Sequence, residues 1–185
     1  MNTQIKGMAI TGTFELIKSR YGQAVFQQIL NELSEEDRKI LGGTILPSIW
    51  YSLKAFNNFL KAEVKIIYNG NSSKLQKGSE EIVNNQLKGI YKFFVKMGSP
   101  EFVVGRIGSV NTSYFNGIEL EKDISTGRFV GKYRGFEADQ EVFEDIIIGF
   151  YRKALEISGA KNIQTRFEIP ISEGKEYAQI LVTWN

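Results

Sequence analysis

The chain has 185 residues, of which 42% are hydrophobic and 24% are charged, and 23 basic against 21 acidic residues give a formal net charge of +2. This length and composition predict one globular domain with a substantial core. The near-neutral charge gives no electrostatic reason to expect nucleic acid as a partner. The sequence has neither histidine nor cysteine, which excludes imidazole bases, thiol nucleophiles, disulfides and thiolate metal sites.

The first half of the chain has helical periodicity. Apolar residues recur at spacings of three and four between Ile10 and Leu33, and Gly22 divides this stretch into two predicted helices. Ser34, followed by three acidic residues, predicts the N-cap of a short helix that ends at Gly42–Gly43. We expect further helices from Ser52 to about residue 69, over 72–97 and from Ser99–Pro100 onward.

The second half changes period. Residues 118–125 alternate between apolar and polar side chains, Thr126–Gly127 suits a two-residue turn, and residues 128–136 supply the returning strand. A strongly apolar helix is predicted over 139–158, and two strands follow at 163–171 and 178–184.

This order predicts an α+β fold, in which N-terminal helices pack on a roughly four-stranded antiparallel sheet made of two hairpins separated by a long helix. We expect a single domain over 1–185, with a mainly helical half (1–117) and a hairpin-helix-hairpin half (118–185). Residues 1–10 lack the pattern of a secretory signal, and no later run approaches the roughly 20 apolar residues of a membrane span. A cytoplasmic location is therefore expected.

One face of the predicted strand 128–136 carries Arg128, Lys132 and Arg134. The two-residue turn sets Glu121 opposite Lys132 and Glu119 opposite Arg134, which favours cross-strand ion pairs. An anion or phosphate site on this face is the alternative. The acidic residues at predicted helix starts are explained by the helix dipole, so no catalytic carboxylate pair is inferred.

Aromatic side chains are the strongest candidates for a binding site, because apolar pockets are commonly lined by them. They would equally well fill an ordinary core, and Trp50 and Tyr51 would then fix how the following helix meets that core. The candidate pocket residues are Trp50, Tyr51, Phe56, Phe94, Phe102, Tyr114 and Phe115.

The opening stretch IKGMAITGTFELIKSRYGQAVFQQILNELS and the closing stretch FEDIIIGFYRKALEISGAKNIQTRFEIPISEGKEYAQILVTW resemble the haem-NO-binding (H-NOX) superfamily. That superfamily includes the 4-vinyl-reductase domains and the TRAPP vesicle-trafficking subunits. The middle stretch LSEEDRKILGGTILPSIWYSLKAFNNFLKA, with its acidic run ahead of a Trp-Tyr pair, resembles an uncharacterised paralogous family of myxobacteria.

The resemblance implies a ligand-binding or interaction fold. H-NOX haem is held by a proximal histidine, and this chain has no histidine. We therefore expect no histidine-ligated haem and no cofactor, and we leave open whether the fold binds an apolar ligand of unknown identity. The expected function is a non-enzymatic sensory module that holds a small hydrophobic ligand in bacterial signalling. The alternative is a protein-interaction adaptor of the same fold without a ligand, as a homodimer or in a complex with a signalling partner.

Overall fold

The computed structural model describes residues 3–86 and 98–185. The second half of the helix predicted over 72–97 therefore lies outside the described residues, as does Phe94. The helices are α1 (Gly7–Asn31), α2 (Glu35–Leu41), α3 (Leu53–Tyr68), η1 (Ser72–Lys74), α4 (Leu75–Gln86), α6 (Pro100–Gly105), α7 (Ile107–Tyr114), η2 (Ala138–Gln140), α8 (Val142–Ile157) and η3 (Ile171–Glu173). The strands are β1 (Gln4–Lys6), β2 (Trp50–Ser52), β3 (Phe115–Asn116), β4 (Glu119–Ser125), β5 (Arg128–Arg134), β6 (Gln164–Ile169) and β7 (Ala178–Thr183).

Helices α2 and α3 begin at the capping residues predicted from the sequence, and α1 is interrupted at the predicted glycine. Gly22 breaks the helical geometry inside α1 with φ +85°, a conformation that glycine adopts without a Cβ clash. The Ser34 hydroxyl accepts a hydrogen bond from the Asp37 N–H at 3.1 Å and so caps α2. Ser52 caps α3 in the same way through the N–H of Ala55 at 3.2 Å.

The four-stranded antiparallel sheet has the order β4-β5-β7-β6. The register predicted from the Thr126–Gly127 turn is confirmed, with Glu121 opposite Lys132. Arg134 pairs with Glu121 (3.2 Å) and Glu176 (3.4 Å) rather than with Glu119, which lies directly opposite. A long guanidinium side chain reaches a diagonal neighbour as readily as the facing residue, which explains the difference.

A second antiparallel sheet, of three very short strands in the order β2-β1-β3, was not predicted. It places Ile5 of β1 between Tyr51 of β2 and Phe115 of β3. This small sheet therefore joins the start of the chain to the start of α3 and to the end of α7.

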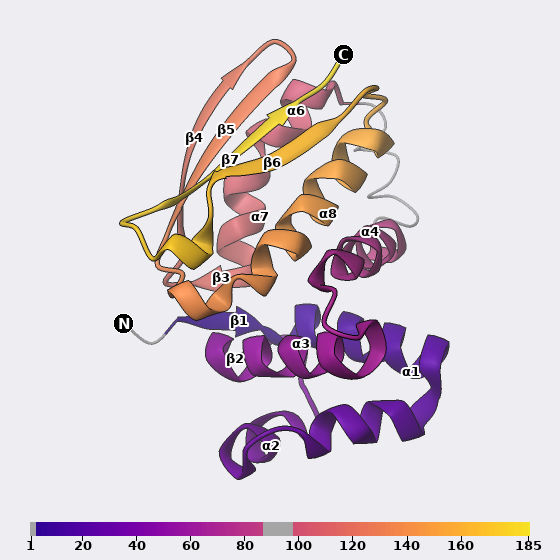
Figure 1. Ribbon diagram of the computed structural model, residues 1–185. Coiled ribbons are helices and arrows are strands. Elements are labelled where there is room, and N and C mark those ends of the chain that lie inside the picture. The colour runs from indigo at the N-terminus through magenta and orange to yellow at the C-terminus, as the bar shows by residue number, and fades with distance from the viewer. Residues whose placement is uncertain (1–2, 87–97) are drawn as a thin grey trace.

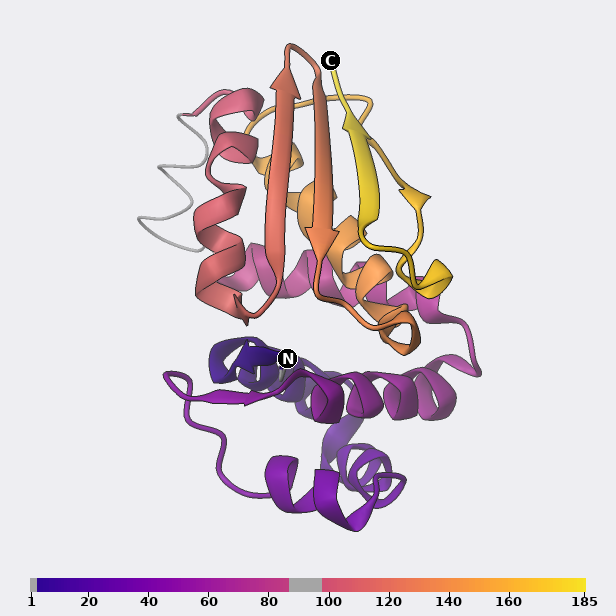
Figure 2. The ribbon, with the colours of Figure 1, turned by 90° about the vertical axis from the view of Figure 1, so that its left-hand side faces the viewer.

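One face of the larger sheet is covered by α8, and α6 and α7 lie along β4 (Figures 1 and 2). On β7, the buried Ala178, Ile180 and Val182 alternate with half-exposed residues, as expected for a sheet covered on one side. Helices α1, α2 and α3 form a separate layer beyond α8 and α4 (Figure 1). The predicted α+β fold class is confirmed. No helix among the described residues is long and apolar enough to cross a membrane.

Candidate functional site

An apolar cavity of about 110 Å³ lies where the N-terminal layer meets α4, α7, α8 and β5. Four helices, α1, α4, α7 and α8, line it with side chains at helical spacing, so each of them turns one stripe toward the same space. Its wall consists of Ile5, Ala9, Thr13, Phe56, Ser79, Ile82, Val83, Ile107, Val110, Asn111, Tyr114, Phe115, Tyr133, Phe143, Ile146, Ile147 and Phe150.

Three polar side chains in this wall are bonded to backbone carbonyls. The Thr13 hydroxyl donates to the carbonyl of Ala9 at 3.2 Å, and the Ser79 hydroxyl donates to that of Ile146 at 2.7 Å. The Asn111 amide donates to the carbonyl of Ile118 at 2.8 Å. None of the described wall residues is charged. The cavity therefore favours a neutral, mainly apolar occupant, because a buried charge without a partner is strongly disfavoured.

Among the described wall residues, Tyr133 of β5 is the one that comes from the four-stranded sheet. Its hydroxyl lies 2.9 Å from the hydroxyl of Tyr151 on α8. Burial raises the pKa of both phenols above the ordinary value, so both stay protonated at neutral pH. This pair connects the cavity wall to the centre of the core beneath the sheet.

The structure brings three of the predicted pocket residues together in the wall, namely Phe56 of α3, Tyr114 of α7 and Phe115 of β3. Phe102 lies on α6 with 48% of its surface exposed, and the Arg106 guanidinium lies over its ring. Eight of the seventeen wall residues are aliphatic, and sequence reasoning did not single them out as site residues. Their helical stripes predict burial and give no sign of an adjoining cavity.

Trp50 and Tyr51 lie on β2, outside the cavity wall. The Lys6 ammonium sits 4.2 Å from the centre of the Trp50 ring, and the Tyr51 hydroxyl accepts a hydrogen bond from the Leu46 N–H at 2.9 Å. A Cβ at Gly7 would overlap the Leu46 carbonyl oxygen, so the loop before β2 packs directly on the start of α1. These contacts make the pair an anchor for that loop.

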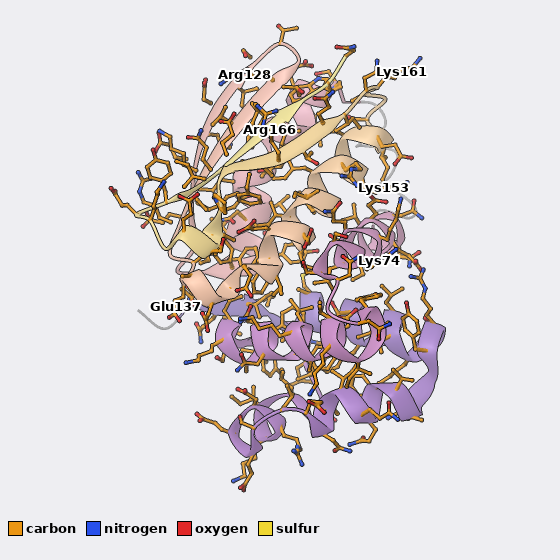
Figure 3. The ribbon with its side chains drawn as sticks, viewed as in Figure 1. Lys74, Arg128, Glu137, Lys153, Lys161 and Arg166 are labelled. Atoms are coloured by element: carbon orange, nitrogen blue, oxygen red, sulfur yellow. The ribbon has the colours of Figure 1, made fainter. Side chains whose placement is uncertain are left out.

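The basic residues considered for an anion site have acidic partners. Lys132 pairs with Glu121 at 3.4 Å, and Arg128 pairs with Asp123 at 3.2 Å. Figure 3 shows Arg128 on β5, Arg166 on β6 and Lys153 on α8. The described residues contain no group of three or more acidic side chains placed to hold a metal ion.

Glu63 of α3 is a buried carboxyl group outside this cavity, with 3% of its surface exposed. Burial raises its pKa to about 7, although a hydrogen bond with Tyr68 acts in the opposite direction. One carboxyl oxygen, Oε2, has no hydrogen-bond partner among the described residues. Tyr68 in turn packs edge-on against Tyr21, with ring centres 6.5 Å apart, beside the Gly22 break in α1.

Solved structures of H-NOX proteins share this fold. The Fe(II) unliganded H-NOX protein from K. algicida aligns with a TM-score of 0.74 at 12% identity, covering 98% of this chain and 97% of that chain. An H-NOX protein from S. oneidensis in the Fe(II)NO ligation state aligns with a TM-score of 0.73 at 12% identity, covering 98% and 99%. An oxygen-binding H-NOX domain related to soluble guanylate cyclases aligns with a TM-score of 0.66 at 10% identity, covering 98% of this chain and 95% of that chain.

These likenesses define the class: the chain has an H-NOX-like fold. No family model matches the sequence, and no curated protein matches it. At 10–12% identity the solved structures establish the fold alone.

The expectation of no cofactor, drawn from the missing histidine, is wrong as stated. Two of the similar solved structures are described as Fe(II) and Fe(II)NO forms of H-NOX proteins. The description of a third concerns heme redox potential and porphyrin distortion. Histidine is one of several side chains that hold haem iron in proteins, and tyrosine and methionine are others. The absence of histidine therefore does not exclude haem from this fold.

The described cavity does not fit a haem in its present shape. Its volume of about 110 Å³ is comparable to that of an apolar cavity of roughly 150 Å³ that accepts one benzene molecule. A porphyrin contains four pyrrole rings and is therefore much larger than this cavity. The Tyr133 hydroxyl is engaged by Tyr151, and the raised pKa disfavours the phenolate that would bind iron.

Proposed function

We propose that this chain is a non-enzymatic sensory domain that holds a small, neutral, apolar ligand in the cavity and signals occupancy to a partner. The observation that carries the proposal is the cavity itself, whose wall is apolar and whose threonine, serine and asparagine donors are bonded to backbone carbonyls. An empty apolar cavity of this size accommodates a single aromatic ring or a short hydrocarbon.

The shared fold supports a ligand-sensing role, because one of the neighbours is described as an oxygen-binding domain related to soluble guanylate cyclases. Both halves of the chain contribute to the wall, for example Phe56 from the first half and Phe143 from the second. This shared wall supports the proposal that residues 1–185 work as one domain. We further propose a relationship to the myxobacterial paralogous family, on the resemblance of the acidic run Glu35–Asp37 and the Trp50–Tyr51 pair.

Fluorobenzene is a suitable probe, because it is neutral, carries one ring and reports binding by ¹⁹F NMR. We expect saturable binding with a shifted or broadened resonance. Native mass spectrometry of freshly purified protein tests in parallel for a ligand carried from the cell. An absorption spectrum of the same preparation, before and after incubation with hemin, reports haem through its Soret band.

Cavity filling provides the specific control. Ala9→Leu places a larger side chain in the wall and should abolish fluorobenzene binding, whereas Ala24→Leu adds the same atoms on the exposed surface of the same helix and should not. Equal binding by the two variants would contradict the proposed site.

A homodimeric interaction module is the second candidate. Met8, Leu46 and Ile49 are large apolar side chains with 38%, 53% and 47% of their surfaces exposed, and backbone hydrogen bonds bring their segments together. Exposed apolar clusters of this kind are typical of interaction surfaces. Sedimentation at micromolar concentration tests this candidate: a dimer that Leu46→Asp dissociates would support it, and a wild-type monomer would contradict it.

A further inference from the structure

A surface groove of about 410 Å³ runs between α1 and α4. It combines polar and apolar side chains, several of which are exposed. Its walls are Met8, Thr11, Gly12, Glu15, Leu16 and Ser19 of α1 and Glu81, Ile82 and Asn85 of α4.

Among the described residues, Ile82 is the one that lines both the groove and the cavity. On α1, by contrast, Ala9 and Thr13 face the cavity, while Gly12 and Leu16 face the groove. We propose that the ligand enters the cavity from this groove by passing the side chain of Ile82. This access route rests on the proposed function, since it requires that the cavity is a binding site.

Contacts between α4 and α8 make the opposite side of α4 an unfavourable route. A Cβ at Gly149 would overlap the carbonyl oxygen of Gln76, so the two helices touch backbone to backbone. Hydrogen bonds from Ser79 to Ile146 (2.7 Å) and from Gln76 to Asp145 (2.6 Å) join the same pair of helices. A ligand passing here would have to break several buried or half-buried contacts at once.

The wall formed by α7 is held to the sheet in a similar way, and so is the preceding helix α6. Asn111 is bonded to the carbonyl of Ile118 at 2.8 Å, and the Lys122 ammonium donates to the carbonyl of Gly105 at 2.6 Å. The hydrogen-bonded strands themselves close the side occupied by Tyr133.

The junction of α1 and α4 is held less tightly. Within the described residues, its polar contact is the ion pair of Arg20 with Glu81, whose side chains are 41% and 37% exposed. Exposed ion pairs of this kind contribute little to stability. Ile82 is only half-buried, and Gly12, which has no side chain, lines the same groove on α1. Passage therefore requires little more than a rotamer change at Ile82, which is a fast motion for a partly exposed side chain.

Ile82→Ala tests the route through exchange kinetics. Removing the side chain between groove and cavity should raise the association rate of fluorobenzene about tenfold, which corresponds to a lower barrier, whereas any change in Kd should match that of the control variant, because both truncations enlarge the cavity. Ile146→Ala is the matched control, because Ile146 is also half-buried and lines the cavity but not the groove. That variant should change Kd through cavity volume and leave the association rate near that of the wild type.

A second variant tests the route without enlarging the cavity. The chain has no cysteine, so Glu15→Cys introduces a single site in the groove for a bulky maleimide. The label should slow both rates and leave Kd unchanged, whereas the same label on Glu119→Cys, an exposed position of β4, should have no effect. Labelling at position 15 also provides a result if Ile82→Ala does not fold.

The outcomes separate the two proposals. Binding of fluorobenzene with rates that respond to Ile82→Ala or to the label at position 15, but not to the controls, supports the route. Binding with rates that neither change affects would overturn the route and leave the ligand site standing. No binding by the wild-type chain would overturn the proposed function and, with it, the route.

Discussion

The hydroxyl groups of Tyr133 and Tyr151 lie 2.9 Å apart in the core, and each is the hydrogen-bond partner of the other. Tyr133→Phe or Tyr151→Phe would leave one buried hydroxyl unsatisfied, at a cost of about 1–3 kcal/mol in the free energy of unfolding. The double substitution removes both polar groups, so it should cost less than the sum of the single substitutions. Urea unfolding of the four proteins measures this, and additive costs would show that the two hydroxyls do not interact.

Gly149 allows α4 to contact α8 closely. A Cβ at this position would overlap the carbonyl oxygen of Gln76 and lie 2.9 Å from the Cβ of Ser79. We expect Gly149→Ala to destabilise the fold by about 1–3 kcal/mol, because the helices must separate. Gly105→Ala is the control in α6, where a Cβ meets nothing within 4 Å, and it should be neutral or stabilising by up to about 1 kcal/mol. Thermal unfolding compares the two, and equal effects would contradict the packing argument.

The elements that the sequence predicts well are those specified by local chemistry. Thr126–Gly127 determines the register of its hairpin, Ser34 and Ser52 cap their helices, and Gly22 breaks α1. The small sheet of β1, β2 and β3 could not be predicted in this way. Strands of two or three residues show no alternation, and their pairing joins segments that are distant in the sequence.

The candidate site was predictable only in part, for a different physical reason. Aromatic composition pointed to Phe56, Tyr114 and Phe115, which do line the cavity. A helical stripe such as Ile82 and Val83 indicates burial, but the existence of a cavity depends on how closely helices approach one another. That distance is determined by tertiary contacts such as the one at Gly149. Trp50 and Tyr51 were predicted as pocket residues but lie outside the cavity wall. Half-buried aromatic residues also serve to anchor a loop, and composition does not distinguish the two roles.

Glu63 should make stability depend on pH. Burial raises its pKa from 4.5 to about 7 in the folded chain. Between these values the folded state retains a proton that the unfolded chain releases, so the free energy of unfolding falls as pH rises through this window. The total loss in the free energy of unfolding is roughly 3 kcal/mol. This loss is complete above about pH 7 and absent below pH 4.5.

Glu63→Gln removes the titrating group and keeps a side chain of similar size. The variant should be more stable than the wild type at pH 8 and should lose most of the decline between pH 4.5 and 7. Urea unfolding across this range measures the difference between the two profiles. Glu119→Gln, on the exposed strand β4, should leave the wild-type profile intact. A wild-type slope in Glu63→Gln would show that other groups cause the pH dependence.

Glu101 fastens α6 to the turn between β4 and β5. Its carboxyl oxygen accepts hydrogen bonds from the Gly127 N–H and from the Trp184 indole, both at 3.3 Å. Its own backbone N–H and these two donors lower its pKa, so the stabilisation that the charged contact provides is present above pH 4.5 and is lost as pH falls through the folded-state value. In a Trp50→Phe background, Trp184 is the remaining tryptophan, and its emission should shift on acidification as the indole's bond to a charged carboxylate becomes a weaker bond to a neutral acid. Glu101→Gln keeps an acceptor oxygen that does not titrate, so the shift should disappear. A shift that persists in Glu101→Gln would assign the transition to another carboxyl group.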